Sequence, residues 1–174
     1  MVWYIDMEGY QFDNKFVAKE IAIVNDDASQ CFHYFIKNPQ QMPDRPNTPT
    51  CYHQFKRHNL EWTFGDYNFS AAISDIRKHI KNEKVFAKGA EKSKFLQKWL
   101  PQLEDTVWIS TSFKKLNNCF SELCKVKHGI QCARRKVHEL MTADKLYKKR
   151  VSEVIVLQMI HEMTDAFSKM SLNN

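Results

Sequence analysis

Three short apolar runs open the chain, and they constrain its fold more than any other feature. They span Val2–Ile5, Phe16–Val24 and Cys31–Ile36. Gly, Asp and Asn, which favour turns, lie between the first two runs at residues 9–14. Apolar runs of this length joined by turns predict an antiparallel meander of three strands.

Helical and strand patterns alternate after the meander. Apolar residues recur every three or four positions in the helical segments, whereas the strand segments are short and apolar. The segments are 65–80 (helix), 84–87 (strand), 91–100 (helix), 106–109 (strand) and two helices that begin at 133 and 146. The order βββαβαβα predicts an α/β domain with a mixed five-stranded sheet flanked by helices.

The length of 174 residues suits a single domain. We assign residues 1–145 to this domain and residues 146–174 to a C-terminal helix packed on it. That helix carries an apolar stripe, listed as Val151, Ile155, Met159, Met163, Ala166 and Met170. The alternative interpretation of the stripe is a surface that docks a protein partner.

Targeting signals are not visible in the sequence. The N-terminus lacks a basic segment, and no stretch approaches 18 apolar residues, so we expect no membrane association. The chain has five Cys, an odd number, and no secretory signal is visible, so we expect reduced thiols. We therefore expect an intracellular protein, cytoplasmic or nuclear.

Positive charge is concentrated in one region. The net charge is +6, but residues 111–150 hold eleven Lys or Arg and three acidic residues, a local charge of +8. A basic lobe of this kind suits a polyanionic partner such as nucleic acid. A solvated lysine-rich face is the alternative.

Asp6 and Glu8 form the first candidate site. Residues two apart on a strand face the same side, so both carboxylates should lie together. Carboxylate pairs of this kind bind Mg²⁺ or Mn²⁺, and a two-metal site can hydrolyse a phosphodiester. Solvated turn residues are the alternative.

A cluster of Cys and His forms the second candidate site. Its pattern is Cys119-x4-Cys124-x3-His128-x3-Cys132. Thiolate sulfur and imidazole nitrogen suit tetrahedral Zn²⁺, which would be structural because four protein ligands leave no open position. The alternative is an assortment of buried thiols and a surface His.

The order of these motifs resembles that of DEDD-type 3′–5′ exonucleases, which have an RNase H-like fold. The segment from Trp3 to Gly9 resembles their first motif, and residues 17–24 resemble their second strand. Residues 32–36, followed by Asn38 and Pro39, resemble their third strand and the loop after it. Two branches, the Maelstrom domain and the arenavirus nucleoprotein exonuclease domain, carry a structural zinc held by Glu, Cys, His and Cys. The resemblance implies Glu20, Cys124, His128 and Cys132 as zinc ligands, with Cys119 as the rival to Glu20.

The chain departs from that family at its later catalytic motifs. The second acidic position falls at Glu91 or Lys92, and Lys92 cannot bind a metal. The usual general base and last carboxylate are replaced by Gln131 and Lys136. His138 and Asp144 offer a shifted substitute whose spacing is one residue too long.

The sequence therefore predicts an exonuclease-like domain that binds nucleic acid, with single-stranded RNA as the expected ligand and a degenerate catalytic site. The resemblance to Maelstrom domains implies a role of this chain in RNA silencing. The expected phosphate-binding residues are Lys114, Lys115, Lys125, Lys127, Arg134, Arg135 and Lys136. Trp62, Phe64 and Tyr67 could stack on bases. The alternatives are an active Mg²⁺- or Mn²⁺-dependent nuclease using Asp6, Glu8, Glu91 and Asp144, and a protein-interaction module.

Overall fold

The computed structural model describes residues 1–12, 15–38, 59–106 and 132–171. The chain divides into two compact units, Met1–Met141 and Thr142–Asn174. The first unit holds the sheet with Asp6, Glu8 and Glu20, and the second continues the last helix.

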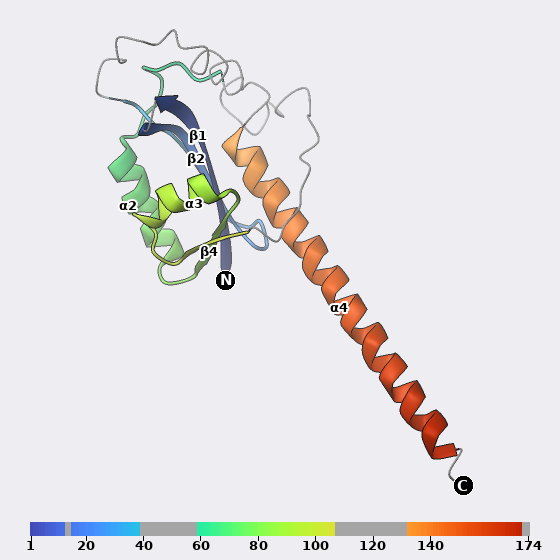
Figure 1. Ribbon diagram of the computed structural model, residues 1–174. Helices are drawn as coiled ribbons and strands as arrows, with labels where there is room; N and C mark the ends of the chain where they lie inside the picture. The colour runs from blue at the N-terminus through green and yellow to red at the C-terminus, as the bar shows by residue number, and fades with distance from the viewer. Residues whose placement is uncertain (13–14, 39–58, 107–131, 172–174) are drawn as a thin grey trace. The chain divides into compact units, whose positions relative to one another are not determined.

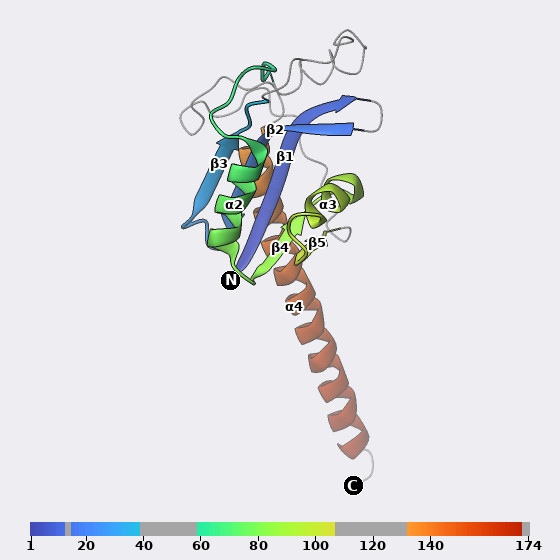
Figure 2. The ribbon, with the colours of Figure 1, turned by 90° about the vertical axis from the view of Figure 1, so that its left-hand side faces the viewer.

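A five-stranded mixed sheet forms the centre of the first unit, as the sequence predicts. Its strand order is β3-β2-β1-β4-β5 (Figure 2). The antiparallel part contains β1 (Val2–Phe12), β2 (Lys15–Asn25) and β3 (Cys31–Phe35). The parallel part contains β4 (Lys84–Ala87) and β5 (Leu103–Asp105). The predicted meander and the predicted strand at 84–87 are therefore confirmed.

Two helices cover one face of the sheet, which we call the core face (Figure 1). They are α2 (Phe69–Ile80) and α3 (Ala90–Gln97). Alternate residues of β1 and β2, such as Ile5 and Ile21, meet apolar residues of α2 here. The Asn68 side chain caps α2 by accepting a hydrogen bond from the Ala71 N–H at 2.7 Å. Packing on this face leaves the other face of the sheet for the candidate sites.

Some boundaries differ from the sequence-based prediction. The helix expected from residue 65 begins at Phe69, because Asn68 is the residue that caps it. The fifth strand was expected at 106–109, but β5 ends at Asp105, and residues 107–109 lie outside the described residues. The two expected final helices form one continuous helix, α4 (Ala133–Ser171).

A β-bulge interrupts the pairing of β1 with β2. Glu8 pairs with Glu20 and Gly9 pairs with Ala18, so Lys19 is the extra residue. A bulge redirects the side chain of the inserted residue and increases the local twist. The Lys19 side chain is fully buried and donates to three backbone carbonyls, those of Ile36, Trp62 and Phe64, at 2.6–2.7 Å.

The second unit consists of the continuation of α4. Many of its large apolar side chains are exposed, by 39% to 66% of their surface. These residues are Leu146, Tyr147, Val151, Val154, Ile155, Val156, Leu157, Met159, Ile160 and Met163. None of the helices that the structure describes combines the length and apolar character needed to cross a membrane.

Candidate functional site

Three buried carboxylates share the face of the sheet opposite the core face, which we call the polar face. Asp6 pairs with Ala22 in the β1–β2 register, and Glu8 pairs with Glu20. Their exposed fractions are 5% for Asp6, 8% for Glu8 and 0% for Glu20. The predicted same-face placement of Asp6 and Glu8 follows from the two-residue period of β1. Buried carboxylates need cations or hydrogen-bond donors, so the partners of each decide what this face can do.

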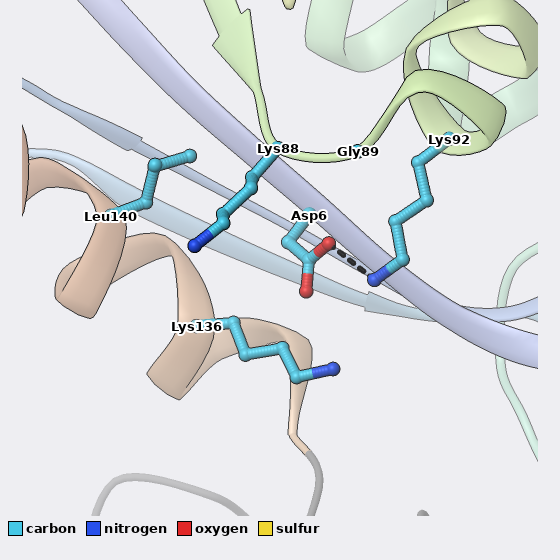
Figure 3. A pocket seen from close by; sticks show the side chains of 6 residues that line it. All are labelled: Asp6, Lys88, Gly89, Lys92, Lys136 and Leu140. Atoms are coloured by element: carbon cyan, nitrogen blue, oxygen red, sulfur yellow. Dashed lines mark hydrogen bonds and ion pairs between the residues drawn. The ribbon is translucent and has the colours of Figure 1, made fainter. Parts of the chain in front are cut away.

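Two lysine ammonium groups neutralise Asp6 and Glu8. Lys92 Nζ on α3 lies 2.6 Å from Asp6 Oδ1 (Figure 3). The same Nζ atom lies 3.4 Å from Glu8 Oε1. Lys136 Nζ, in the first turn of α4, donates to Glu8 Oε1. Since two ammonium groups carry the same charge as one divalent cation, the pair is balanced without a metal.

The turn between β4 and α3 brings Lys92 to this position. Gly89 precedes the first residue of α3 and has a φ of 105°, which L-residues with side chains rarely adopt. Its N–H donates to Asp105 Oδ1 at 3.2 Å, which ties the turn to β5. Lys88 and Lys92 therefore reach the same space from the two sides of one turn (Figure 3).

The ion pairs oppose the effect of burial on the titration of this cluster. Burial raises the pKa of Asp6 above its ordinary value, even though Lys92 and Lys136 act in the other direction. Burial also acts to raise the pKa of Glu8, but Lys92 and Lys136 outweigh it and lower that pKa. Burial acts to lower the pKa of Lys92, whereas Asp6 and Glu8 raise it well above its usual range. Glu8 and Lys92 are thus held in their charged forms at neutral pH.

A pocket of about 260 Å³ opens beside Asp6, and we call it the Asp6 pocket. It is lined by Asp6, Lys88, Gly89, Lys92, Lys136 and Leu140 (Figure 3). Lys88 is partly buried, and burial lowers the pKa of its amine. Three lysines and one carboxylate make the lining of this pocket electropositive, which suits an anionic ligand.

Glu91 and Asp144 are the other two carboxylates proposed for catalysis. Glu91 is exposed in the first turn of α3, and its neighbour Lys92 is the α3 residue that contacts Asp6. Asp144 belongs to the second unit and forms an ion pair with Lys148, with Oδ2 and Nζ 2.7 Å apart. Burial and the charge of Arg134 both lower the pKa of His138.

Glu20 forms a second cluster with His33 and Cys132. Its Oε1 atom lies 2.6 Å from His33 Nε2 and 3.5 Å from Cys132 Sγ. Glu20 and Cys132 are thus neighbours, as the proposed zinc site requires, and carboxylate, thiolate and imidazole are all zinc ligands. Cys119, Cys124 and His128 lie outside the described residues. Within the described ranges alone, no group of three or more His, Cys, Asp and Glu side chains is arranged to hold a metal ion.

The predicted nucleic-acid contacts are described in part. Arg134, Arg135 and Lys136 begin α4, and Arg135 Nε lies 3.0 Å from Glu139 Oε1. The four predicted contacts Lys114, Lys115, Lys125 and Lys127 lie outside the described residues.

The three candidate stacking residues each pack against another ring. Trp62 meets Tyr10, Phe64 meets Phe35 and Tyr67 meets Tyr34, with ring centroids 5.2–5.7 Å apart. Tyr67 keeps 44% of its surface exposed, so it is the one of the three that offers the most open ring.

Sequence reasoning missed His33, Lys19 and Lys88. The signal for His33 was present, because Cys31, His33 and Phe35 alternate on one face of β3. Placing His33 beside Glu20 also requires the β2–β3 register. In that register Ala22 lies opposite His33, and Glu20 is two residues from Ala22 on the same face of β2. No sequence pattern marked the other two residues, because the bulge and the turn that direct them depend on the assembled sheet.

Comparisons with known proteins add no further assignment. No protein-family model matches the chain, and no curated protein sequence matches it at a significant level.

Proposed function

We propose that this chain is an exonuclease-like nucleic-acid-binding domain, with RNA as its ligand, in which lysine ion pairs replace the catalytic metal site. The observation that carries this proposal is the placement of Lys92 and Lys136 on Asp6 and Glu8. The RNase H-like assignment is part of the proposal, and the mixed sheet with the order β3-β2-β1-β4-β5 is compatible with it.

The lysines act against metal binding for an electrostatic reason. A divalent cation at Asp6 and Glu8 would displace both ammonium groups from their partners. The Lys92 side chain keeps only 28% of its surface exposed and that of Lys136 only 16%, so neither charge would be well solvated in place. Removing the partner of a largely buried charge costs on the order of several kcal/mol, which competes with the metal.

The charge around the Asp6 pocket favours a nucleic-acid ligand. Lys88, Lys92 and Lys136 line this pocket, and Arg134 and Arg135 precede Lys136 on α4. Phosphate groups provide sequence-independent affinity for such surfaces. The basic segment at 111–150 extends the same charge in the sequence.

A labelled-oligonucleotide assay tests both halves of the proposal. With Mg²⁺ or Mn²⁺ present, we expect no metal-dependent shortening of RNA or DNA by the full chain. A metal-dependent product that disappears in Asp6→Ala would show an active nuclease instead. Binding to labelled RNA should weaken steeply between roughly 50 and 200 mM salt, because bound phosphates release counterions. An affinity for RNA that does not change with salt would contradict the proposal that the chain binds nucleic acid.

We also propose that zinc is a structural cofactor of this domain. Glu20 and Cys132 contribute two neighbouring donors from the described residues, and His33 lies on the same oxygen of Glu20. Cys124 and His128 are the expected remaining ligands, with Cys119 as the alternative to Glu20. Bound there, zinc would tie the basic segment to the sheet and leave no position open for catalysis.

A protein-interaction module is the second candidate function. The observation that favours it is the run of exposed apolar side chains on α4. Such side chains often mark a docking surface. A second copy of the chain is the first partner to test. The light-scattering mass of the full chain should rise with concentration, and Ile155→Glu with Met159→Glu should abolish the rise.

A further inference from the structure

Asp6 presents one carboxylate oxygen to the Asp6 pocket. Its Oδ1 atom accepts the hydrogen bond from Lys92, whereas its Oδ2 atom is buried and has no hydrogen-bond partner among the described residues. Figure 3 shows Oδ2 directed into the space between Lys88 and Lys136. A buried acceptor without a donor is costly, so this oxygen calls for a ligand or water that carries a hydroxyl or amino group.

The space beside Oδ2 is larger than a water site. The pocket volume of about 260 Å³ compares with roughly 30 Å³ for one water molecule in the liquid. Leu140 forms an apolar wall, and the rest of the lining is polar. A small polar group of a larger ligand therefore fits the pocket better than a single ordered water does.

The charges that surround the pocket specify an anion. Lys88, Lys92 and Lys136 carry three positive charges, and Asp6 and Glu8 carry two negative ones. The amines outnumber the carboxylates here, which suits a phosphodiester because that group carries one negative charge. A suitable ligand thus combines an anion with a hydrogen-bond donor a few ångströms away.

We propose that the Asp6 pocket binds one ribonucleotide unit of single-stranded RNA, with its phosphate near Lys88 and Lys136 and its 2′-hydroxyl donating to Asp6 Oδ2. This inference rests on the proposed function and adds to it a selection of RNA over DNA. The 2′-hydroxyl is the group that distinguishes the two polymers, and it lies beside the phosphate in every ribonucleotide. A base amino group is the other donor of this size, and it would give no such selection.

Three oligonucleotides of one sequence test the proposal on the full chain. They are RNA, DNA and 2′-O-methyl RNA, each on the order of ten nucleotides and without uracil or thymine. We expect RNA to bind about tenfold more tightly than DNA, the effect of one charge-assisted hydrogen bond. The 2′-O-methyl RNA should behave as DNA does, because it lacks the donor.

Two variants and one control assign the effect to residues. Asp6→Asn keeps the shape of the side chain, but its amide nitrogen cannot accept a hydrogen bond from the 2′-hydroxyl. The ratio of RNA affinity to DNA affinity should therefore fall to about one. Lys88→Ala should weaken all three ligands by a similar factor, since phosphate contacts do not distinguish RNA from DNA. Lys94→Ala removes an exposed charge from α3 and should leave the ratio unchanged.

The possible failures are distinguishable. Equal affinity of the wild-type chain for RNA and DNA would overturn the 2′-hydroxyl contact and leave the proposed function standing. An unchanged ratio in Asp6→Asn would also overturn it. Binding of none of the three ligands would overturn the proposed function and this inference together. The comparison of ligands on the wild-type chain keeps the test decisive even where a variant fails to fold.

Discussion

Glu8 and Glu20 lie directly opposite each other in the β1–β2 register, and both are buried. Like charges at opposed positions destabilise a sheet unless each has its own partner. Glu8 is neutralised by lysines, whereas Glu20 is bound by His33 and Cys132. The polar face thus holds two neighbouring charge systems with different chemistry, and each leads to its own predictions.

The first prediction concerns Lys92. Lys92→Met should lower the free energy of unfolding by about 2–4 kcal/mol in urea denaturation at pH 7, because it leaves the buried Asp6 carboxylate without its donor. The matched control is Lys94→Met, an exposed lysine two residues along α3, which should change stability by less than about 0.5 kcal/mol.

A double substitution separates the ion pair from simple packing. Asp6→Asn combined with Lys92→Met removes both charges, so it should cost less stability than Lys92→Met alone. If the double variant is instead as unstable as the sum of the two single variants, the contact between Asp6 and Lys92 is not the source of the effect.

The second prediction is that the stability of the fold depends on pH through the ionisation of Glu8. Because the pKa of Glu8 is lowered from its ordinary value of 4.5, the charged group stabilises the fold above that value and loses the contribution as pH falls below it. Glu8→Gln should therefore be less stable than wild type near pH 7, and the difference should shrink below about pH 4.5. Chemical denaturation at a series of pH values measures it. A difference that stays constant down to pH 3 would contradict the assignment.

The fold of the first unit was largely predictable from residue patterns. The short apolar run at Val2–Ile5 and the helical spacing at 65–80 reflect burial, which the sequence records directly. The ends of elements were less predictable, since Asn68 competes with Gly65 as the helix start. The continuity of α4 was missed because its apolar pattern changes near residue 146, whereas its backbone continues without a break.

The candidate site was predictable from residue patterns only where it depended on one strand. Asp6 and Glu8 share a face because of strand geometry alone. The replacement of the family's last carboxylate by Lys136 came from the resemblance and not from strand geometry. The sequence could not decide whether Glu91 or Lys92 would face Asp6. That depends on the rotation of α3 about its axis, which Gly89 and the packing of the helix determine. The side chain of Lys19 depends on a bulge, and bulges depend on the register of two strands rather than on one residue type.

The third prediction concerns Lys19, which joins β2 to the segment at 60–67. Lys19→Met removes the donor to the carbonyls of Ile36, Trp62 and Phe64, which lie in buried or partly buried contacts. Burial lowers the pKa of Lys19 to about 8, so the amine is still protonated at neutral pH. We expect a loss of about 2–4 kcal/mol and faster proteolysis near residues 62–64. Lys37→Met, at an exposed position, is the control, and equal proteolysis of both variants would contradict the prediction.

The fourth prediction concerns zinc and the cluster around Glu20. Elemental analysis of gently purified protein should find about one zinc per chain, and a chelator should lower the midpoint of thermal unfolding. Cys132→Ser should abolish binding. Cys31→Ser should retain it, because Cys31 is a partly exposed thiol outside the proposed ligand set and tests only the loss of sulfur.

Two further variants identify the fourth zinc ligand. Glu20→Gln weakens a carboxylate ligand without changing its shape, and Cys119→Ser removes the rival thiolate. If Glu20 is the ligand, Glu20→Gln should lose zinc and Cys119→Ser should keep it, since tetrahedral zinc accepts only four donors. The reverse result would assign Cys119 as the ligand and leave Glu20 as a hydrogen-bond partner of His33. Less than about half an equivalent of zinc in the wild-type protein would exclude a full structural site and leave the Glu20, His33 and Cys132 cluster as a hydrogen-bonded one.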